Sequence, residues 1–169
     1  VPPGFVVVAS AFDYFIQETG LEKEINATLE SVNPHDSETV EQASKKIQGL
    51  ILNDSAHIPA AIIDETSGSF KSLGATYVAV RSSATAEDSS AAAWAGQLDT
   101  YLNTTEKTLI QNLKKCWASL YTPRAIFYRF EKGMKDFKVS VAVVVQKMVS
   151  SSAAGIAFSV HPVTEDRNQ

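Results

Sequence analysis

The chain has 169 residues, of which 44% are hydrophobic and 20% charged, with a formal net charge of −4. This length fits about one domain, and the acidic balance argues against broad, non-specific binding to nucleic acid or to an anionic membrane. Its single cysteine, Cys116, excludes an intramolecular disulfide and fits a reducing cytoplasm, and no run approaches the roughly 20 apolar residues of a membrane span.

Neither end of the sequence resembles the natural end of a protein. The start, Val1-Pro2-Pro3-Gly4-Phe5, lacks a methionine and the basic region of a signal peptide. The last five residues are polar and contain no closing element. We therefore expect residues 1–169 to be a single partial domain of a longer polypeptide.

The first half of the chain is predicted to be mainly helical. A short extended segment at 5–9 precedes a helix that Ser10 caps and Gly20 ends. Apolar residues at helical spacing predict further helices over 21–32, 37–52 and 59–70, the last interrupted near Gly68.

Strands are concentrated in the second half. β-branched residues predict a strand at 76–82, followed by a loop at 83–95 and an extended segment at 96–103. Thr105 caps an amphipathic helix, and Thr122-Pro123 begins another that ends at Gly133. Strands are predicted at 137–149 and 154–160. The pattern indicates an α+β or mixed α/β domain, and of the two we expect α+β, with helices early and antiparallel strands late.

Arg81, at the end of the strand at 76–82, is the first candidate site residue. A guanidinium on a rigid strand can bind phosphate oxygens bidentately and stays charged at any working pH. The alternative is an ion pair with Glu87 or Asp88.

Gly96 and Thr100 form the second candidate site. A glycine permits close approach of the backbone to a polyphosphate, and the Thr100 hydroxyl adds a donor. The alternative is a surface loop followed by a strand. The sequence has neither a phosphate-binding Walker A pattern nor a Gly-rich dinucleotide fingerprint.

The third candidate is the strand at 143–149. Its apolar surface can line a slot for a flat base, and Met148 suits contact with an aromatic ring. The alternative is a core strand that ends in an exposed Gln146-Lys147 pair.

The sequence supports neither a metal site nor a catalytic nucleophile. The histidines and Cys116 have no metal-ligand spacing. Ser82, Ser83 and His161 do not form a nucleophile motif, because no nucleophile elbow surrounds either serine. Trp117 is interpreted as a core or lid residue, and the Lys114-Lys115 pair as a solvated helix face.

Four segments resemble, in order, the nucleotide-binding part of the phosphoenolpyruvate synthase and pyruvate phosphate dikinase family. They begin with Val1-Pro2-Pro3-Gly4-Phe5 and continue with Val80-Arg81-Ser82-Ser83-Ala84-Thr85-Ala86-Glu87-Asp88, Ala95-Gly96-Gln97-Leu98-Asp99-Thr100-Tyr101-Leu102-Asn103 and Val145-Gln146-Lys147-Met148-Val149. The segment 155–164 is also similar to the family pattern. The resemblance covers nearly the whole chain.

This resemblance implies an ATP-grasp-like domain that binds ATP between two subdomains. Arg81 would contact the phosphates, Gly96 and Thr100 would belong to the loop that covers them, and Gln146 would lie near the adenine, beside Met148. The serine- and alanine-rich stretch 89–94 departs from the family pattern, which leaves the contacts of that loop open.

The remaining parts of such an enzyme are expected elsewhere. The resemblance implies an ATP-binding lysine before this chain, and Mg²⁺ ligands, a phosphorylatable carrier histidine and a pyruvate-binding barrel after it. His161 does not match the carrier histidine. The expected parent enzyme transfers phosphate from ATP to that histidine and then to pyruvate, whereas the chain alone is expected to be inactive.

Three other functions stay open. Rifampicin phosphotransferases share this front part but modify a different acceptor. A dikinase that uses orthophosphate usually has a methionine-rich loop where this chain has Ala95-Gly96-Gln97. A non-catalytic nucleotide-binding module is the third.

Overall fold

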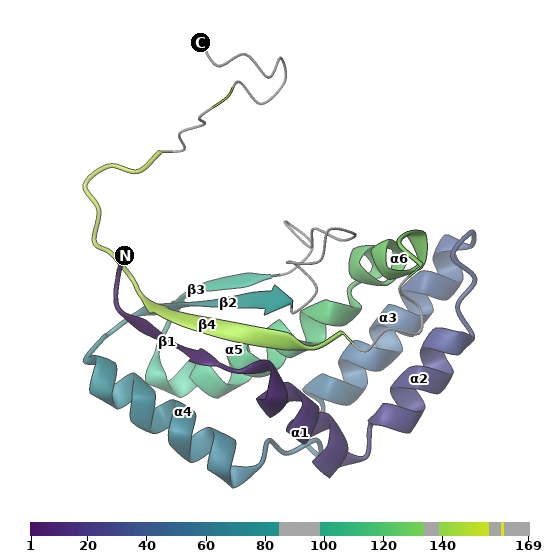
Figure 1. The fold of residues 1–169 in the computed structure, drawn as a ribbon, viewed down its shortest axis with the longest axis horizontal. Helices are drawn as coiled ribbons and strands as arrows, with labels where there is room; N and C mark the ends of the chain where they lie inside the picture. The colour runs from purple at the N-terminus through teal and green to yellow at the C-terminus, as the bar shows by residue number, and fades with distance from the viewer. Residues whose placement is uncertain (85–98, 134–138, 156–159, 161–169) are drawn as a thin grey trace.

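A four-stranded antiparallel sheet, in the order β1-β4-β2-β3, organises the fold (Figure 1). The structure is a computed structural model and describes residues 1–84, 99–133, 139–155 and 160. Strands β4 (Val141–Lys147) and β2 (Val78–Ala84) lie in the centre, and β1 (Gly4–Val7) and β3 (Thr100–Thr104) form the edges. Strand β1, from the start of the chain, therefore pairs with β4, from near its end.

Six α-helices and one short 3-10 helix accompany the sheet in the described part of the chain. Four of them precede β2 and the others lie between β3 and β4. Their bounds are α1 Ala9–Thr19, α2 Glu22–Glu30, α3 Ser37–Leu52, α4 Ala60–Leu73, α5 Glu106–Ala118, η1 Ser119–Tyr121 and α6 Pro123–Glu131.

The two faces of the sheet have different surroundings. Helices α1, α4 and α5 contact the strands and lie beneath one face (Figure 1). Val80, Val143 and Val145 point to this side and are fully buried. Alternate residues point the other way, to a face that no described helix covers. We call it the open face; its residues include Val6, Arg81, Thr100, Leu102, Val144 and Gln146.

The core lies between the sheet and the helices. Trp117 of α5 is fully buried, and its ring stacks on Phe15 of α1 with the centroids 5.0 Å apart. Ile47 and Ile51 of α3 are also fully buried. Trp117 is therefore a core residue, one of the two roles that the sequence predicts.

The fold confirms the α+β class and most of the predicted helices. Helix α3 has the bounds expected from its apolar stripe, and the Asp36 carboxylate accepts a hydrogen bond from the Glu38 amide at its start. Gly20 ends α1 in a left-handed conformation, with φ of 68°. Thr105 caps α5, and the hydroxyl of Thr122 accepts from the Ala125 amide at the start of α6.

Three local predictions are wrong. Helix α1 begins at Ala9, after Val8, so Ser10 is not its cap. Helix α4 runs through Gly68 without interruption, because glycine at an exposed helical position costs only about 1 kcal/mol. Lys114 is not merely solvated, since its ammonium donates to the carbonyls of Asn53 and Ala56 at 2.9 and 2.8 Å.

The predicted strands agree in position where the structure describes them. The expected strands at 76–82, 96–103 and 137–149 correspond to β2, β3 and β4. Residues 154 and 155 have no regular structure, and most of the last predicted strand, at 154–160, lies outside the described residues. Within the described residues, no helix has the length and apolar character required to cross a bilayer.

Candidate functional site

A row of four residues crosses the open face. Arg81 of β2 pairs with Thr100 of β3 on one side and with Val144 of β4 on the other, and Val144 pairs with Val6 of β1. Side chains of directly paired residues lie about 4.5–5.5 Å apart at Cβ. The strand register thus places two predicted site residues, Arg81 and Thr100, next to each other.

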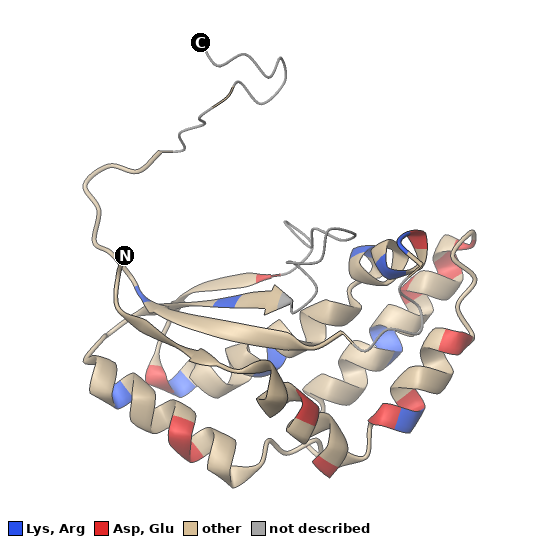
Figure 2. Ribbon diagram, viewed as in Figure 1, with Lys and Arg blue, Asp and Glu red and all other residues tan. Residues whose placement is uncertain are grey.

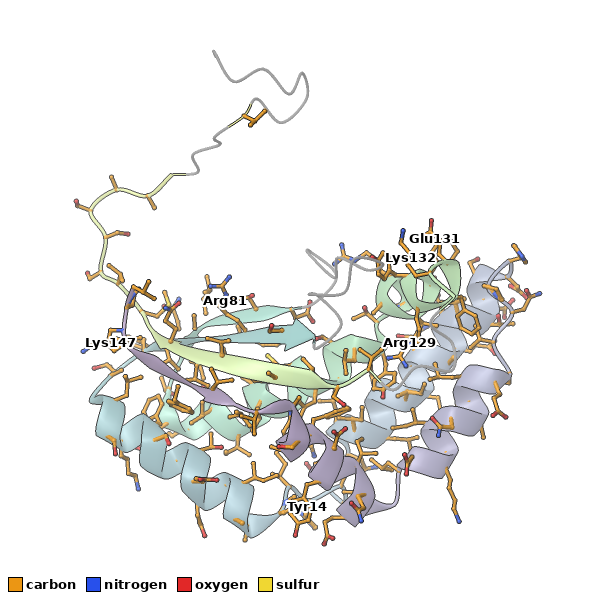
Figure 3. The ribbon with its side chains drawn as sticks, in the orientation of Figure 1. Tyr14, Arg81, Arg129, Glu131, Lys132 and Lys147 are labelled. Atoms are coloured by element: carbon orange, nitrogen blue, oxygen red, sulfur yellow. The ribbon has the colours of Figure 1, made fainter. Side chains whose placement is uncertain are left out.

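The Arg81 side chain is exposed and points away from the helices (Figure 3). The four strands carry two charged residues, Arg81 and Lys147, and both are cations (Figure 2). No salt bridge to Arg81 is found among the described residues. Glu87 and Asp88, the alternative partners, lie outside that part of the chain. The guanidinium is therefore presented to solvent from a rigid strand, where it can bind an anion.

Gln146 lies on the same face, two residues along β4 from the Arg81 row. It pairs with Ala79 of β2 and Gly4 of β1. Its side-chain amide donates to the carbonyl of Pro2 at 3.1 Å, and the Lys147 amide donates to that of Pro3 at 2.9 Å. The motif at the start of the chain is therefore held directly against the Gln-Lys motif of β4.

Met148 follows β4 and extends this end of the face. Its backbone amide donates to the Tyr77 carbonyl at 3.0 Å, and its side chain is partly buried. Tyr77 is 50% exposed. The partly apolar surface around these residues contrasts with the cationic and hydroxyl groups of the Arg81 row.

The two ends of the open face therefore differ in their chemistry. Tyr77, Gln146 and Met148 lie at one end, and Arg81 and Thr100 lie about two to four residues along the strands, or roughly 7–13 Å away. Strand β2 continues beyond Arg81 to Ala84, so residue 85 follows at the end remote from Met148. Gly96, the remaining predicted site residue, lies outside the described residues.

A hydrogen-bonded cluster on the helix-covered side was missed by the sequence analysis. Ser82 donates to the Asp99 carbonyl from both its amide, at 3.3 Å, and its hydroxyl, at 2.7 Å. The Tyr101 hydroxyl donates to the Asp99 carboxylate at 3.1 Å. The sequence contains one signal for this cluster. Asp99 and Tyr101 are two residues apart, so the alternation of side chains along a strand predicts that they share a face.

The Tyr101 hydroxyl and the neighbouring Cys116 thiol are kept neutral. Burial, followed by the nearby Asp99 carboxylate, raises the pKa of the Cys116 thiol from 9.0 to about 12. Burial and the same carboxylate also raise the pKa of Tyr101. A protonated thiol is a poor nucleophile, so Cys116 is structural.

Two grooves formed by described residues lie away from the Arg81 row. One, of about 570 Å³, runs between β1 and α4 and is lined by Phe5, Glu65 and Ser72, among others. The other, of about 290 Å³, lies between α2 and α3. Neither contains Arg81, Thr100 or Gln146. Among the described residues, no three His, Cys, Asp or Glu side chains come together as a metal site.

Comparison with known protein families identifies the family of this chain. The model of the pyruvate phosphate dikinase AMP/ATP-binding domain matches residues 1–169. The chain belongs to this family. The resemblance found in its four motifs is therefore confirmed.

Relatives of the AMP/ATP-binding domain include two proteins described as "probable phosphoenolpyruvate synthase". The protein of Methanocaldococcus jannaschii is 44% identical over 176 residues, which cover 100% of this chain and 15% of that protein. The protein of Archaeoglobus fulgidus is 44% identical over 173 residues, covering 99% and 23%. Rifampicin phosphotransferase of Bacillus cereus is 38% identical over 169 residues, covering 99% and 19%.

The chain spans only 15–23% of the length of these three relatives. The AMP/ATP-binding domain is thus matched throughout this chain, while most of each relative lies outside the matched region.

Proposed function

We propose that the open face binds ATP, with the phosphates at Arg81 and Thr100 and the adenine toward Gln146 and Met148. The observation that carries this proposal is the convergence of three separate motifs on one face of the sheet. Membership of an AMP/ATP-binding family supports it.

The chemistry of the face fits this ligand. Arg81 is an exposed cation with planar donors that match phosphate oxygens, and Thr100 lies beside it with a hydroxyl. The strands carry no carboxylate that would repel a polyphosphate. At the other end, Met148 and Tyr77 offer apolar surface, and Gln146 retains an amide oxygen as an acceptor for a base.

In the proposed ATP-grasp-like arrangement, this sheet forms one wall of the site and a second subdomain forms the other. Mg²⁺ would be held by carboxylate and amide oxygens outside the described residues. It would supply positive charge to the transferring phosphoryl group. Gly96 is proposed to lie in the segment that covers the phosphates.

For the longer protein we propose the activity of a phosphoenolpyruvate synthase. Phosphate would pass from ATP to a carrier histidine and then to pyruvate. The role of this chain would be to bind and orient ATP, and Arg81 would stabilise charge on the phosphoryl oxygens. A cytoplasmic location is part of this proposal.

A rifampicin-type phosphotransferase is the second candidate, because such an enzyme is 38% identical to this chain. The acceptor would be bound by another domain in either case. Incubating the longer protein with ATP and either pyruvate or rifampicin, and identifying the phosphorylated product, separates the two. A protein that binds ATP but phosphorylates neither would support a non-catalytic nucleotide-binding module.

The decisive test of nucleotide binding is a titration of the chain with ATP and Mg²⁺, followed through backbone amide NMR signals. We expect weak binding, with a dissociation constant well above the micromolar range, because the second subdomain of the proposed site is not part of this chain. The largest shifts are expected at Arg81, Thr100 and Gln146. Shifts confined to the groove between β1 and α4 would refute the proposed location.

A pair of charge-matched variants separates the role of Arg81 from general charge. Arg81→Met should weaken ATP binding by about 10-fold or more, since a hydrogen bond to a charged group contributes about 1.5–3 kcal/mol. Lys45→Met removes the same charge from an exposed position of α3 and should leave binding within twofold. Equal losses in both variants would argue against a specific phosphate contact.

A further inference from the structure

Ser82 and Asp99 are the chain neighbours of Arg81 and Thr100, but they face the other side of the sheet. Arg81 and Thr100 are directly paired on the open face. Ser82 follows Arg81 and Asp99 precedes Thr100, so their contact lies one residue further along the two strands than the Arg81–Thr100 pair. We call the contact between Ser82 and Asp99 the clasp.

The clasp continues the pairing of β2 and β3 beyond Arg81 and Thr100. The Ser82 amide reaches the Asp99 carbonyl at 3.3 Å, which is long for a backbone hydrogen bond. The Ser82 hydroxyl reaches the same oxygen at 2.7 Å, the usual length for a hydroxyl donor. The shorter of the two hydrogen bonds to the Asp99 carbonyl is therefore donated by the Ser82 side chain.

The surroundings of the clasp keep both partners in place. The Tyr101 hydroxyl holds the Asp99 carboxylate at 3.1 Å, and the Lys115 ammonium lies 5.5 Å from the centre of the Tyr101 ring. Below Ser82, the Ser119 hydroxyl donates to the Cys116 carbonyl at 2.7 Å. Ser119 Oγ is 3.5 Å from Ser82 Oγ. Residues of α5 and η1 therefore pack against the clasp on the helix-covered side of the sheet.

We propose that Ser82 is a positioning residue, whose hydroxyl bond to the Asp99 carbonyl fixes the spacing between Arg81 and Thr100 for phosphate binding. This inference rests on the proposed ATP site. The two open-face residues come from different strands, so the pairing of β2 with β3 sets the spacing between them. Misplacement of a binding group by about 1 Å is enough to weaken a preorganised site.

Four variants test the role of the hydroxyl. Ser82→Ala removes it, Ser82→Thr keeps it, and Ser82→Val matches the shape of threonine without it. Tyr101→Phe removes the hydrogen bond that holds the Asp99 carboxylate. We expect Ser82→Ala and Ser82→Val to weaken ATP binding at least threefold, Ser82→Thr to restore it to within twofold, and Tyr101→Phe to cause a smaller loss.

A second measurement requires no nucleotide. Backbone ¹⁵N relaxation of the free chain should give order parameters near 0.85 for the Arg81 and Thr100 amides, falling toward about 0.6 in Ser82→Ala and Ser82→Val. Amides of α3 should be unchanged. A wild-type chain that fails to bind ATP would reject the proposed site, whereas these order parameters would still decide whether the hydroxyl fixes the strands.

Two results would overturn the inference. One is wild-type order and affinity in Ser82→Ala. The other is equal behaviour of Ser82→Thr and Ser82→Val, which would show that packing and not the hydroxyl matters. If Ser82→Ala does not fold, the threonine and valine variants decide the question by the same two measurements.

Discussion

Two arginines of this domain have opposite surroundings. Arg81 is exposed on the open face, whereas Arg129 of α6 is 5% exposed and projects into the interior (Figure 3). Its Nε and Nη2 atoms are buried without hydrogen-bond partners among the residues that the structure describes. Its guanidinium lies 5.6 Å from the centre of the Tyr121 ring, and burial lowers its pKa. Arg129 therefore bears a desolvation cost that the ring offsets only in part.

Replacing Arg129 with Met should raise the free energy of unfolding of the chain by about 1 kcal/mol or more. Buried ion pairs replaced by apolar residues of similar volume often give a neutral or stabilising change of about 1–4 kcal/mol, and an unpaired cation has less attraction to lose. Urea denaturation measures the change. Arg124→Met, at an exposed position of the same helix, should stay within about 0.5 kcal/mol. A marked loss of stability in Arg129→Met would show that the guanidinium has a stabilising partner.

At the scale of single residues, the motifs supplied the candidate side chains but did not predict that they share one face of the sheet. Arg81, Thr100 and Gln146 were chosen from three separate motifs, and the strand register brings them together. The bond between Ser82 and Asp99 was not predicted, because a serine hydroxyl can find a partner in many places. Only the register of β2 and β3 selects that carbonyl. Gly96 stays a prediction.

Gly4 marks a close approach between strands β1 and β4. A Cβ atom at this position would collide with the carbonyl oxygen of Val145 and lie 3.0 Å from the Cα atom of Gln146. Both are backbone atoms, which cannot rotate away. The absence of a side chain at Gly4 is therefore what allows the edge strand to lie against β4 here.

Gly4→Ala should destabilise the domain by about 1–3 kcal/mol, because the clash forces the backbone of β1 to shift. The matched control is Gly49→Ala in α3, where a Cβ atom meets nothing within 4 Å. That change should stabilise by about 0.5–1 kcal/mol, since alanine is the better helix former. Thermal and urea unfolding of both variants give the comparison. Similar stability in the two variants would contradict the close approach.

Element boundaries were predictable where local chemistry decides them. Helix α3 follows from its apolar spacing, and Gly20, Thr105 and Thr122 end or begin helices as their chemistry suggests. Ser10 was mistaken for a cap because α1 begins one residue earlier, directly after Val8. The sheet order was not predicted, since antiparallel strands joined by several helices can pair in more than one way.

Over the whole molecule, the sheet has a protected centre and two exposed edges. Strands β2 and β4 pair with each other and each has a second neighbour, whereas β1 and β3 have one neighbour each among the described strands. The buried valines are concentrated in the central pair. The edges should therefore open more readily than the centre.

Native-state hydrogen exchange should reveal this difference. We expect the hydrogen-bonded amides between β2 and β4 to exchange only through global unfolding, and those of β1 and β3 to exchange through smaller openings. Exchange of Val144 and Gln146, whose amides face β2, compared with Val7 and Tyr101, measured by NMR as denaturant is added, provides the test. Edge amides as slow as the central ones would show that the sheet opens only as a unit.

The pairing of β1 with β4 has a consequence for biosynthesis. Pro2 and Gln146, which contact each other, are 144 residues apart in the chain. At translation rates of about 5–20 residues per second, roughly 7–30 s would pass between the synthesis of Pro2 and that of Gln146. Strand β4 lies between β1 and β2, so the four described strands cannot form this sheet on the ribosome until β4 has emerged. Nascent chains that end before β4 would expose the apolar edges that β4 normally joins. We expect chaperones to bind such edges.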